Sequence, residues 1–128
     1  MNALGTLVAA RQVIPAMRRK GQGSIIVIGA TASRKGGPKS AAFSSAKGAQ
    51  RSLAESMARH LWPAGIHEAL IVIDGVVDLP STRARMPDKA DSFFVNPDDI
   101  AATVASVARQ PRSAWSFEVE ARPFGETW

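Results

Sequence analysis

Two runs of consecutive apolar residues constrain the fold of this chain most strongly. Residues 24–28 (SIIVI) and 69–73 (ALIVI) are short, rich in β-branched side chains and free of charge. Such runs are typical of strands that are buried on both faces of a parallel sheet. Apolar residues at helical spacing over 3–20 and 41–62 predict a helix before and after the first run. The sequence therefore predicts that strands and helices alternate.

The last third of the chain continues this alternation. Asn96 is a good capping residue and Pro97 suits the first position of a helix, which we expect to end near Arg109. Residues 115–120 alternate apolar with polar side chains and predict a strand with one solvated face, whereas residues 78–95 are expected to be irregular. The whole order predicts an α/β fold of three layers, in which helices cover a short parallel sheet.

The predicted sheet is small, because only three strands are expected in 128 residues. Its first strand is as apolar as an interior strand, although three strands leave it at an edge. No repeat or linker divides the chain, so we expect one domain over residues 1–128. The pattern further predicts that more sheet stands before residue 1, or that a partner supplies it.

Composition excludes several classes of function. The chain contains no cysteine, which excludes disulfides and thiol catalysis and fits a cytoplasmic protein. Its net charge is +5 and it has no tyrosine, so a solvated basic surface is favoured over a nucleic-acid interface. No apolar run approaches the ~20 residues of a membrane span.

A few individual side chains also carry expectations. Glu68 stands at the start of the second apolar run, where an unpaired buried carboxylate is costly, so we expect it at a strand end or edge. Trp115 and Phe117 are expected to fill the core. His60 and His67 lack a third ligand and are interpreted as surface or strand-end residues, so no metal site is predicted.

The most specific motif opens the second helix. Residues 41–49 read AAFSSAKGA, and Phe43 and Lys47 are four residues apart, on one helix face. This segment resembles the Tyr-x-x-x-Lys motif of the short-chain dehydrogenase/reductases. In that family the lysine lowers the pKa of the tyrosine and binds the nicotinamide ribose, while the tyrosine exchanges a proton with the substrate oxygen.

The resemblance extends along nearly the whole chain. Residues 2–5 (NALG) resemble the family's Asn-x-x-Gly, residues 65–67 (GIH) its approach to the sixth strand, and residues 74–77 (DGVV) its Pro-Gly-x-Val segment. Residues 96–101 resemble the helix before its last strand, and residues 79–95 its substrate loop. The implied fold is a partial, Rossmann-like one that matches the last three strands of the family's sheet.

The resemblance also implies a cofactor and site residues. NAD or NADP is the implied cofactor, with Lys47, Gly75 and Val77 on the side that binds it. Asn2, Lys47 and the residue at the Phe43 position form the implied catalytic set. A carbonyl compound or secondary alcohol is the implied substrate.

Several residues depart from the family pattern. Phe43 has no hydroxyl for proton transfer and is interpreted as a packed aromatic residue. The family's catalytic serine lies thirteen residues before the tyrosine, at the position of Ala30; Thr31 and Ser33 are nearby candidates at a different spacing. Leu79 replaces a usual threonine. The chain also contains no glycine-rich turn for the dinucleotide phosphates, which gives little reason to expect this chain alone to bind NAD(P).

Two functions follow from these observations. The first is an NAD(P)-dependent oxidoreductase whose 128 residues lack the dinucleotide-binding half, so that the chain alone is inactive or strongly impaired. The second is a truncated gene product or non-catalytic interaction module. In either case we expect homo-oligomers that associate through helices 3–20 and 41–62, because the family packs the corresponding helices against a second subunit.

Overall fold

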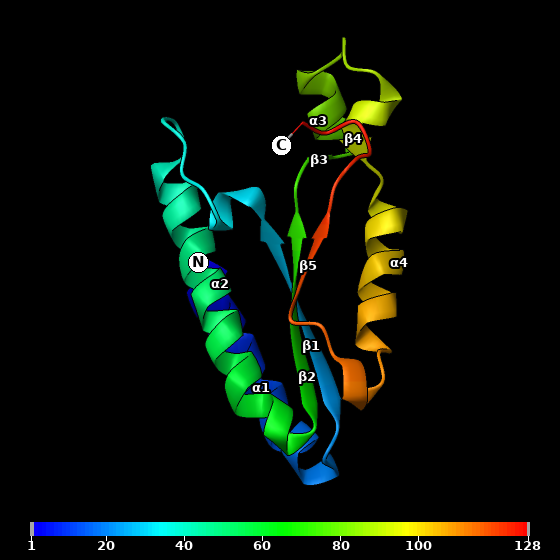
Figure 1. Ribbon diagram of the computed structural model, residues 1–128. Helices are drawn as coiled ribbons and strands as arrows, with labels where there is room; N and C mark the ends of the chain where they lie inside the picture. The colour runs from blue at the N-terminus through cyan, green and yellow to red at the C-terminus, as the bar shows by residue number, and fades with distance from the viewer. Residues whose placement is uncertain (1, 128) are drawn as a thin grey trace.

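The computed structural model describes residues 2–127, and its elements alternate as the sequence predicts (Figure 1). The helices are α1 (Asn2–Lys20), α2 (Ala41–Leu61), α3 (Pro80–Arg85) and α4 (Pro97–Ala108). The strands are β1 (Gly23–Ala30), β2 (Ile66–Ile73), β3 (Val76–Val77), β4 (Phe94–Val95) and β5 (Glu118–Ala121). A short 3-10 turn, η1 (Thr31–Ser33), follows β1.

The main sheet has the order β1-β2-β5, and both neighbouring pairs are parallel. In its register Ile28 of β1 faces Ile71 of β2, and Val72 of β2 faces Glu120 of β5. Helices α1 and α2 cover one face and α4 covers the other (Figure 1). The predicted three-layer α/β fold with a short parallel sheet is therefore confirmed.

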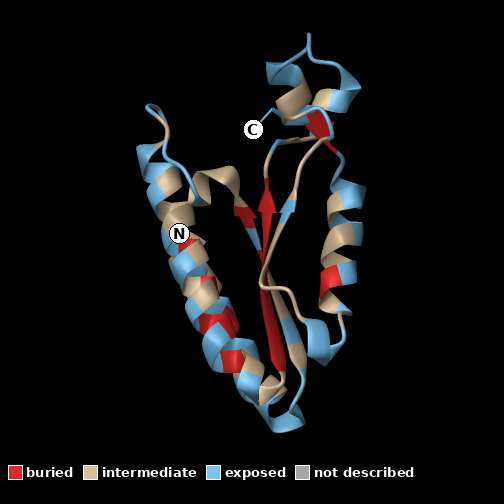
Figure 2. Ribbon diagram, viewed as in Figure 1, coloured by how far each residue is buried: buried red, intermediate tan, exposed pale blue. Residues whose placement is uncertain are grey.

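Strand β2 is the centre of the core, since all eight of its residues are buried (Figure 2). Ile66 packs with Met57 and Leu61 of α2, on the face that α1 and α2 cover. Ala69, Ile71 and Ile73 belong instead to the cluster that α4 completes. This is the behaviour of a continuous apolar run between two helical layers.

Local sequence explains how the helices begin and end. The Asn96 side chain accepts a hydrogen bond from the Asp98 amide at 2.8 Å, and Pro97 follows it as the first residue of α4. Helix α1 continues through Pro15 without the break that this residue favours. Its neighbours Ile14 and Met17 pack against the core, and this packing offsets the lost backbone hydrogen bond.

Two stretches differ from the sequence-based expectations. Residues 78–95 are more regular than expected, because they contain α3 and β4, and β4 pairs with β3 in a second, two-stranded sheet. The last strand begins at Glu118 rather than at residue 115. Trp115 lies before it, stacked on the His67 ring at 4.7 Å between ring centroids. His67 is the second residue of β2, which agrees with the expected position at a strand end. It does not lie at the surface, because it is buried and its Nε2 bonds the Ser116 carbonyl at 2.8 Å.

Glu68 also contradicts the expectation that it lies at a strand end or edge. It is the third residue of the central strand and is fully buried. Neither carboxyl oxygen has a hydrogen-bond partner among the described residues, and burial raises the pKa of this group to about 8. Glu68 is therefore protonated in the folded protein at neutral pH.

The buried carboxyl makes stability depend on pH. Because its folded pKa of about 8 lies above the ordinary 4.5, the unfolded chain releases a proton that the folded chain keeps, and stability falls as pH rises between these values. We expect Glu68→Gln to flatten this slope and to raise the free energy of unfolding at neutral pH by up to about 3 kcal/mol. Urea unfolding from about pH 5 to about pH 8 measures both effects.

The exposed carboxylate Asp88 provides a matched control for this change. Asp88→Asn should leave the slope as it is in the parent chain. Parallel pH profiles for the parent and Glu68→Gln would show that Glu68 is ionised in the folded protein, contrary to its buried position.

Candidate functional site

The residues predicted to act in chemistry gather where β1 and β2 end and α2 begins (Figure 1). Turn η1, which carries Thr31 and Ser33, follows β1 and packs against α2. Asp74 and Gly75 follow β2 directly. The carboxyl ends of parallel strands are the usual position of ligand sites in open α/β sheets.

Lys47 is held at this edge by two hydrogen bonds. Its Nζ donates to the Ile28 carbonyl oxygen at 3.1 Å and to Gln50 Oε1 at 2.9 Å. Burial lowers the pKa of the Lys47 ammonium from its ordinary value. The side chain is thus fixed between α2 and the end of β1, and one of its three N–H donors remains for another acceptor.

Gln50 extends this contact into a chain of hydrogen bonds that reaches α1. Its Nε2 donates to Thr6 Oγ1 at 2.9 Å, and Thr6 Oγ1 donates to the Asn2 carbonyl at 2.9 Å. Asn2 and Lys47 are therefore connected, but through the backbone of Asn2. Sequence reasoning missed Gln50 and Thr6; the only signal was that Gln50 stands three residues after Lys47, on the same helix face.

Phe43 lies one turn before Lys47 in α2, and its side chain is 51% exposed. The expectation that it is a packed aromatic residue is therefore wrong. The reason is its place near the amino end of α2, beyond the buried positions of that helix, which begin at Gln50.

The two candidate hydroxyl groups of η1 differ in their surroundings. Thr31 Oγ1 donates to Asp74 Oδ1 and lies 3.4 Å from the Ile73 carbonyl, so its single proton is engaged. Asp74 also pairs with Arg122, whose Nε is 3.5 Å from Asp74 Oδ2. Ser33 Oγ is buried and has no hydrogen-bond partner among residues 2–127.

Gly75 and Val77 are positioned by the second sheet and the C-terminal segment. A Cβ at Gly75 would lie 2.8 Å from both Pro123 Cδ and Val95 Cγ2, so only glycine fits there. Val77 pairs with Val95, and its carbonyl oxygen accepts a hydrogen bond from Thr82 Oγ1 at 2.6 Å. One of the two lone pairs of that carbonyl oxygen is therefore used within the chain itself.

Residues 79–95 are fastened to the strand ends by Arg83. Its guanidinium donates to both Asp78 oxygens, at 2.6 and 2.7 Å, and to Asp91 at 2.6 Å. It also lies over the Phe94 ring, 4.2 Å from the centroid. These hydrogen bonds hold the pKa of the Asp78 carboxyl below its usual range. Together with the Thr82 hydrogen bond to the Val77 carbonyl and the pairing of β4 with β3, these contacts hold the segment beside Val77.

The described part of the chain contains no group of three His, Cys, Asp or Glu side chains suited to a metal ion. No helix in that part has the length and apolar character needed to cross a membrane.

Comparison with known proteins identifies the family. The chain matches the family model for short chain dehydrogenases over residues 1–90, and it belongs to that family. No curated protein sequence matches the chain.

Solved structures give the same result. A short-chain dehydrogenase from Rhodopseudomonas palustris is 38% identical, with a TM-score of 0.77, and the match covers 97% of this chain but 49% of that one. A metagenomic short-chain oxidoreductase in complex with NADP is 27% identical, with a TM-score of 0.74 and coverage of 95% and 49%. A serine dehydrogenase complexed with NADP+ shares the fold, at 19% identity and a TM-score of 0.85 over 99% of this chain and 54% of that chain. The chain thus spans about half the length of these structures.

Proposed function

We propose that the chain contributes Lys47 to the active site of an NAD(P)-dependent oxidoreductase that acts on a carbonyl compound or secondary alcohol. We further propose that this chain alone is inactive or strongly impaired. The observation that carries this proposal is the fixed position of Lys47, which is bonded to Ile28 and Gln50 at the carboxyl edge of the sheet. The 27% identical oxidoreductase in complex with NADP supports a nicotinamide cofactor.

The residues present fit the nicotinamide ribose. Lys47 uses two N–H donors within the chain, and the third is available to a ribose hydroxyl. When bound, the nicotinamide supplies or accepts the hydride that moves to or from the carbonyl carbon. Gly75, which brings the backbone close to Pro123 and Val95, and Val77 are the proposed neighbours of the carboxamide.

The site lacks a well-positioned donor for proton transfer to the substrate oxygen. Phe43 has no acidic hydrogen, and the Thr31 hydroxyl proton is engaged by Asp74. The Oγ atom of Ser33 is buried, so it reaches a substrate oxygen only if η1 moves. We therefore assign the proton to water, with Lys47 as the nearby cation. Loss of a positioned general acid costs about 10²–10⁴-fold in rate.

The first prediction for this function concerns cofactor binding without turnover. The chain lacks the glycine-rich turn for the dinucleotide phosphates, so we expect titration with NADH and NADPH, followed by cofactor fluorescence, to give only a weak saturable change. Lys47→Met should remove this change, because Lys47 is the proposed ribose donor. Carbonyl reduction should stay near the background rate.

Two outcomes would count against this function. The absence of any saturable change would remove the cofactor site and favour the second candidate, described next. Steady NAD(P)H-dependent carbonyl reduction by the purified chain would contradict the proposed impairment.

A second candidate function, as an association module, is favoured by the outer face of α1. Leu4, Leu7 and Val8 are close together on this face, and their side chains are 62%, 38% and 53% exposed. A stripe of exposed apolar residues on a helix commonly marks a protein interface. We propose that two copies of the chain associate through this stripe and the neighbouring surface of α2.

Sizing in solution tests the association. We expect a homo-oligomer in which Leu4→Asp with Val8→Asp produces monomers, because charges would replace the apolar contact. Val13→Glu serves as the control, since Val13 lies on the other side of α1. A parent chain that is monomeric at every concentration would contradict this candidate.

A further inference from the structure

The hydrogen bonds that connect Lys47 to α1 all run in one direction. Lys47 Nζ donates to Gln50 Oε1 at 2.9 Å, and Gln50 Nε2 donates to Thr6 Oγ1 at 2.9 Å. Thr6 Oγ1 in turn donates to the Asn2 carbonyl oxygen at 2.9 Å. We call these three bonds the Thr6–Gln50 network. It ends on a backbone oxygen of α1, which can only accept a hydrogen bond.

Gln50 is a polar residue at a buried position of α2. It is 8% exposed, and the other buried positions of this helix are apolar: Ala54, Met57, Ala58 and Leu61. A buried amide is costly unless its donor and its acceptor both find partners. Gln50 meets this requirement with Lys47 on its own helix and Thr6 on α1. Packing alone does not require this residue, because an apolar side chain would fill the position without needing hydrogen bonds.

The hydroxyl group of Thr6 decides which end of the Gln50 amide faces Lys47. A threonine hydroxyl has a single proton, and Thr6 donates it to the Asn2 carbonyl. Thr6 Oγ1 therefore only accepts from Gln50, so the amide must turn its NH2 group to Thr6 and its oxygen to Lys47. A reversed amide would place its NH2 group against the ammonium and its oxygen against the lone pairs of Thr6 Oγ1.

The oriented amide gives the Lys47 ammonium an acceptor at a partly buried position. Burial lowers the pKa of this group, because its charged form loses contact with water. Hydrogen bonds that the charged form donates oppose this effect. The acceptors are the Gln50 amide oxygen and the Ile28 carbonyl, and both are uncharged. Gln50 thus favours the protonated form of Lys47 and, together with Ile28, fixes the directions of two of its three N–H groups.

We propose that Thr6 and Gln50 are positioning residues, which hold the Lys47 ammonium in one orientation so that its third N–H stays free for a ligand. Neither residue needs to touch the reacting atoms, because each acts through Lys47. The assignment of that ligand as a nicotinamide ribose rests on the proposed function. Helix α1 thereby takes part in the site through the side chain of Thr6 as well as through Asn2.

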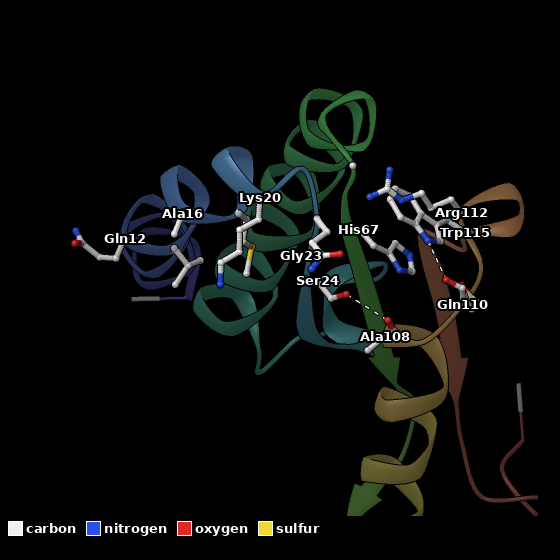
Figure 3. A pocket seen from close by; sticks show the side chains of 14 residues that line it. Gln12, Ala16, Lys20, Gly23, Ser24, His67, Ala108, Gln110, Arg112 and Trp115 are labelled. Atoms are coloured by element: carbon white, nitrogen blue, oxygen red, sulfur yellow. Dashed lines mark hydrogen bonds between the residues drawn. The ribbon is translucent and has the colours of Figure 1, made fainter.

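Trace acetylation of the full chain with acetic anhydride at a series of pH values tests the proposal. Only the neutral amine reacts, so the pH of half-maximal rate for each lysine, measured by peptide mass spectrometry, reports its protonation. The exposed Lys20 is the internal reference. It lines a hollow at the amino end of β1 together with Gly23 and Ser24 (Figure 3), whereas Lys47 contacts Ile28 near the other end of that strand.

The decisive variant is Thr6→Val, which keeps the size of the side chain but removes the acceptor for the Gln50 NH2 group. The freed amide then turns its NH2 group toward Lys47. The half-maximal pH of Lys47 should therefore fall by at least about half a pH unit, while that of Lys20 stays as in the parent. Thr6→Ser retains the hydroxyl and should restore the parent profile.

Further variants provide the matched controls. Thr103 Oγ1 donates to the Asp99 carbonyl four residues earlier on an exposed helix face, so Thr103→Val removes the same kind of bond and should leave Lys47 unchanged. Gln50→Leu removes the acceptor and should lower the half-maximal pH of Lys47. Gln50→Glu supplies a carboxylate and should raise it. Circular dichroism checks that each variant is folded.

Two results would overturn the proposal. One is a Lys47 profile in Thr6→Val that equals that of the parent. The other is an equal shift in Thr6→Val and Thr6→Ser, which would reflect a general loosening of α1. Failure of the proposed function has a different signature: reduced nicotinamide mononucleotide would not protect Lys47 of the parent from acetylation, while the variants would still shift as expected.

Discussion

The parallel pairing of β2 with β1 and β5 is the constraint on which the rest of the structure depends. All eight residues of β2 are buried, and their side chains form the core on both faces of the sheet. Because the three strands point the same way, their carboxyl ends bring η1, Asp74 and the residues after β5 to one edge.

The candidate site is a direct consequence of that arrangement. The Ile28 carbonyl, near the end of β1, gives Lys47 a fixed acceptor, and Gln50 and Thr6 connect this contact to α1. The Lys47 ammonium is thus held beside the end of β1 in the absence of a ligand. Such a fixed donor is what the positioning of a ribose hydroxyl requires. The proton-transfer part is less complete, because Phe43 is aprotic and Asp74 engages Thr31.

Sequence alone was sufficient for the three strands of the main sheet, for α1, α2 and α4 and for the family, because apolar runs, capping residues and short motifs are local signals. It failed where tertiary contacts decide. Glu68 is buried because it belongs to the central strand, in which every residue is buried. Its carboxyl group nevertheless has no hydrogen-bond partner among the described residues. The hydrogen bond from Gln50 to Thr6 forms only because α1 lies against α2, and β4 forms only because it pairs with β3. A local sequence pattern contains neither of these tertiary contacts.

The most direct test of the account observes the Lys47 ammonium itself. Nitrogen NMR of the lysine side chains, with Lys47→Met for assignment, should show Lys47 titrating below the ordinary lysine range, because burial lowers its pKa. Addition of reduced nicotinamide mononucleotide, which has the nicotinamide ribose but no adenylate, should shift that signal more than those of exposed lysines such as Lys89. A Lys47 signal that titrates normally and ignores this ligand would contradict the claim that Lys47 is positioned for a nicotinamide ribose.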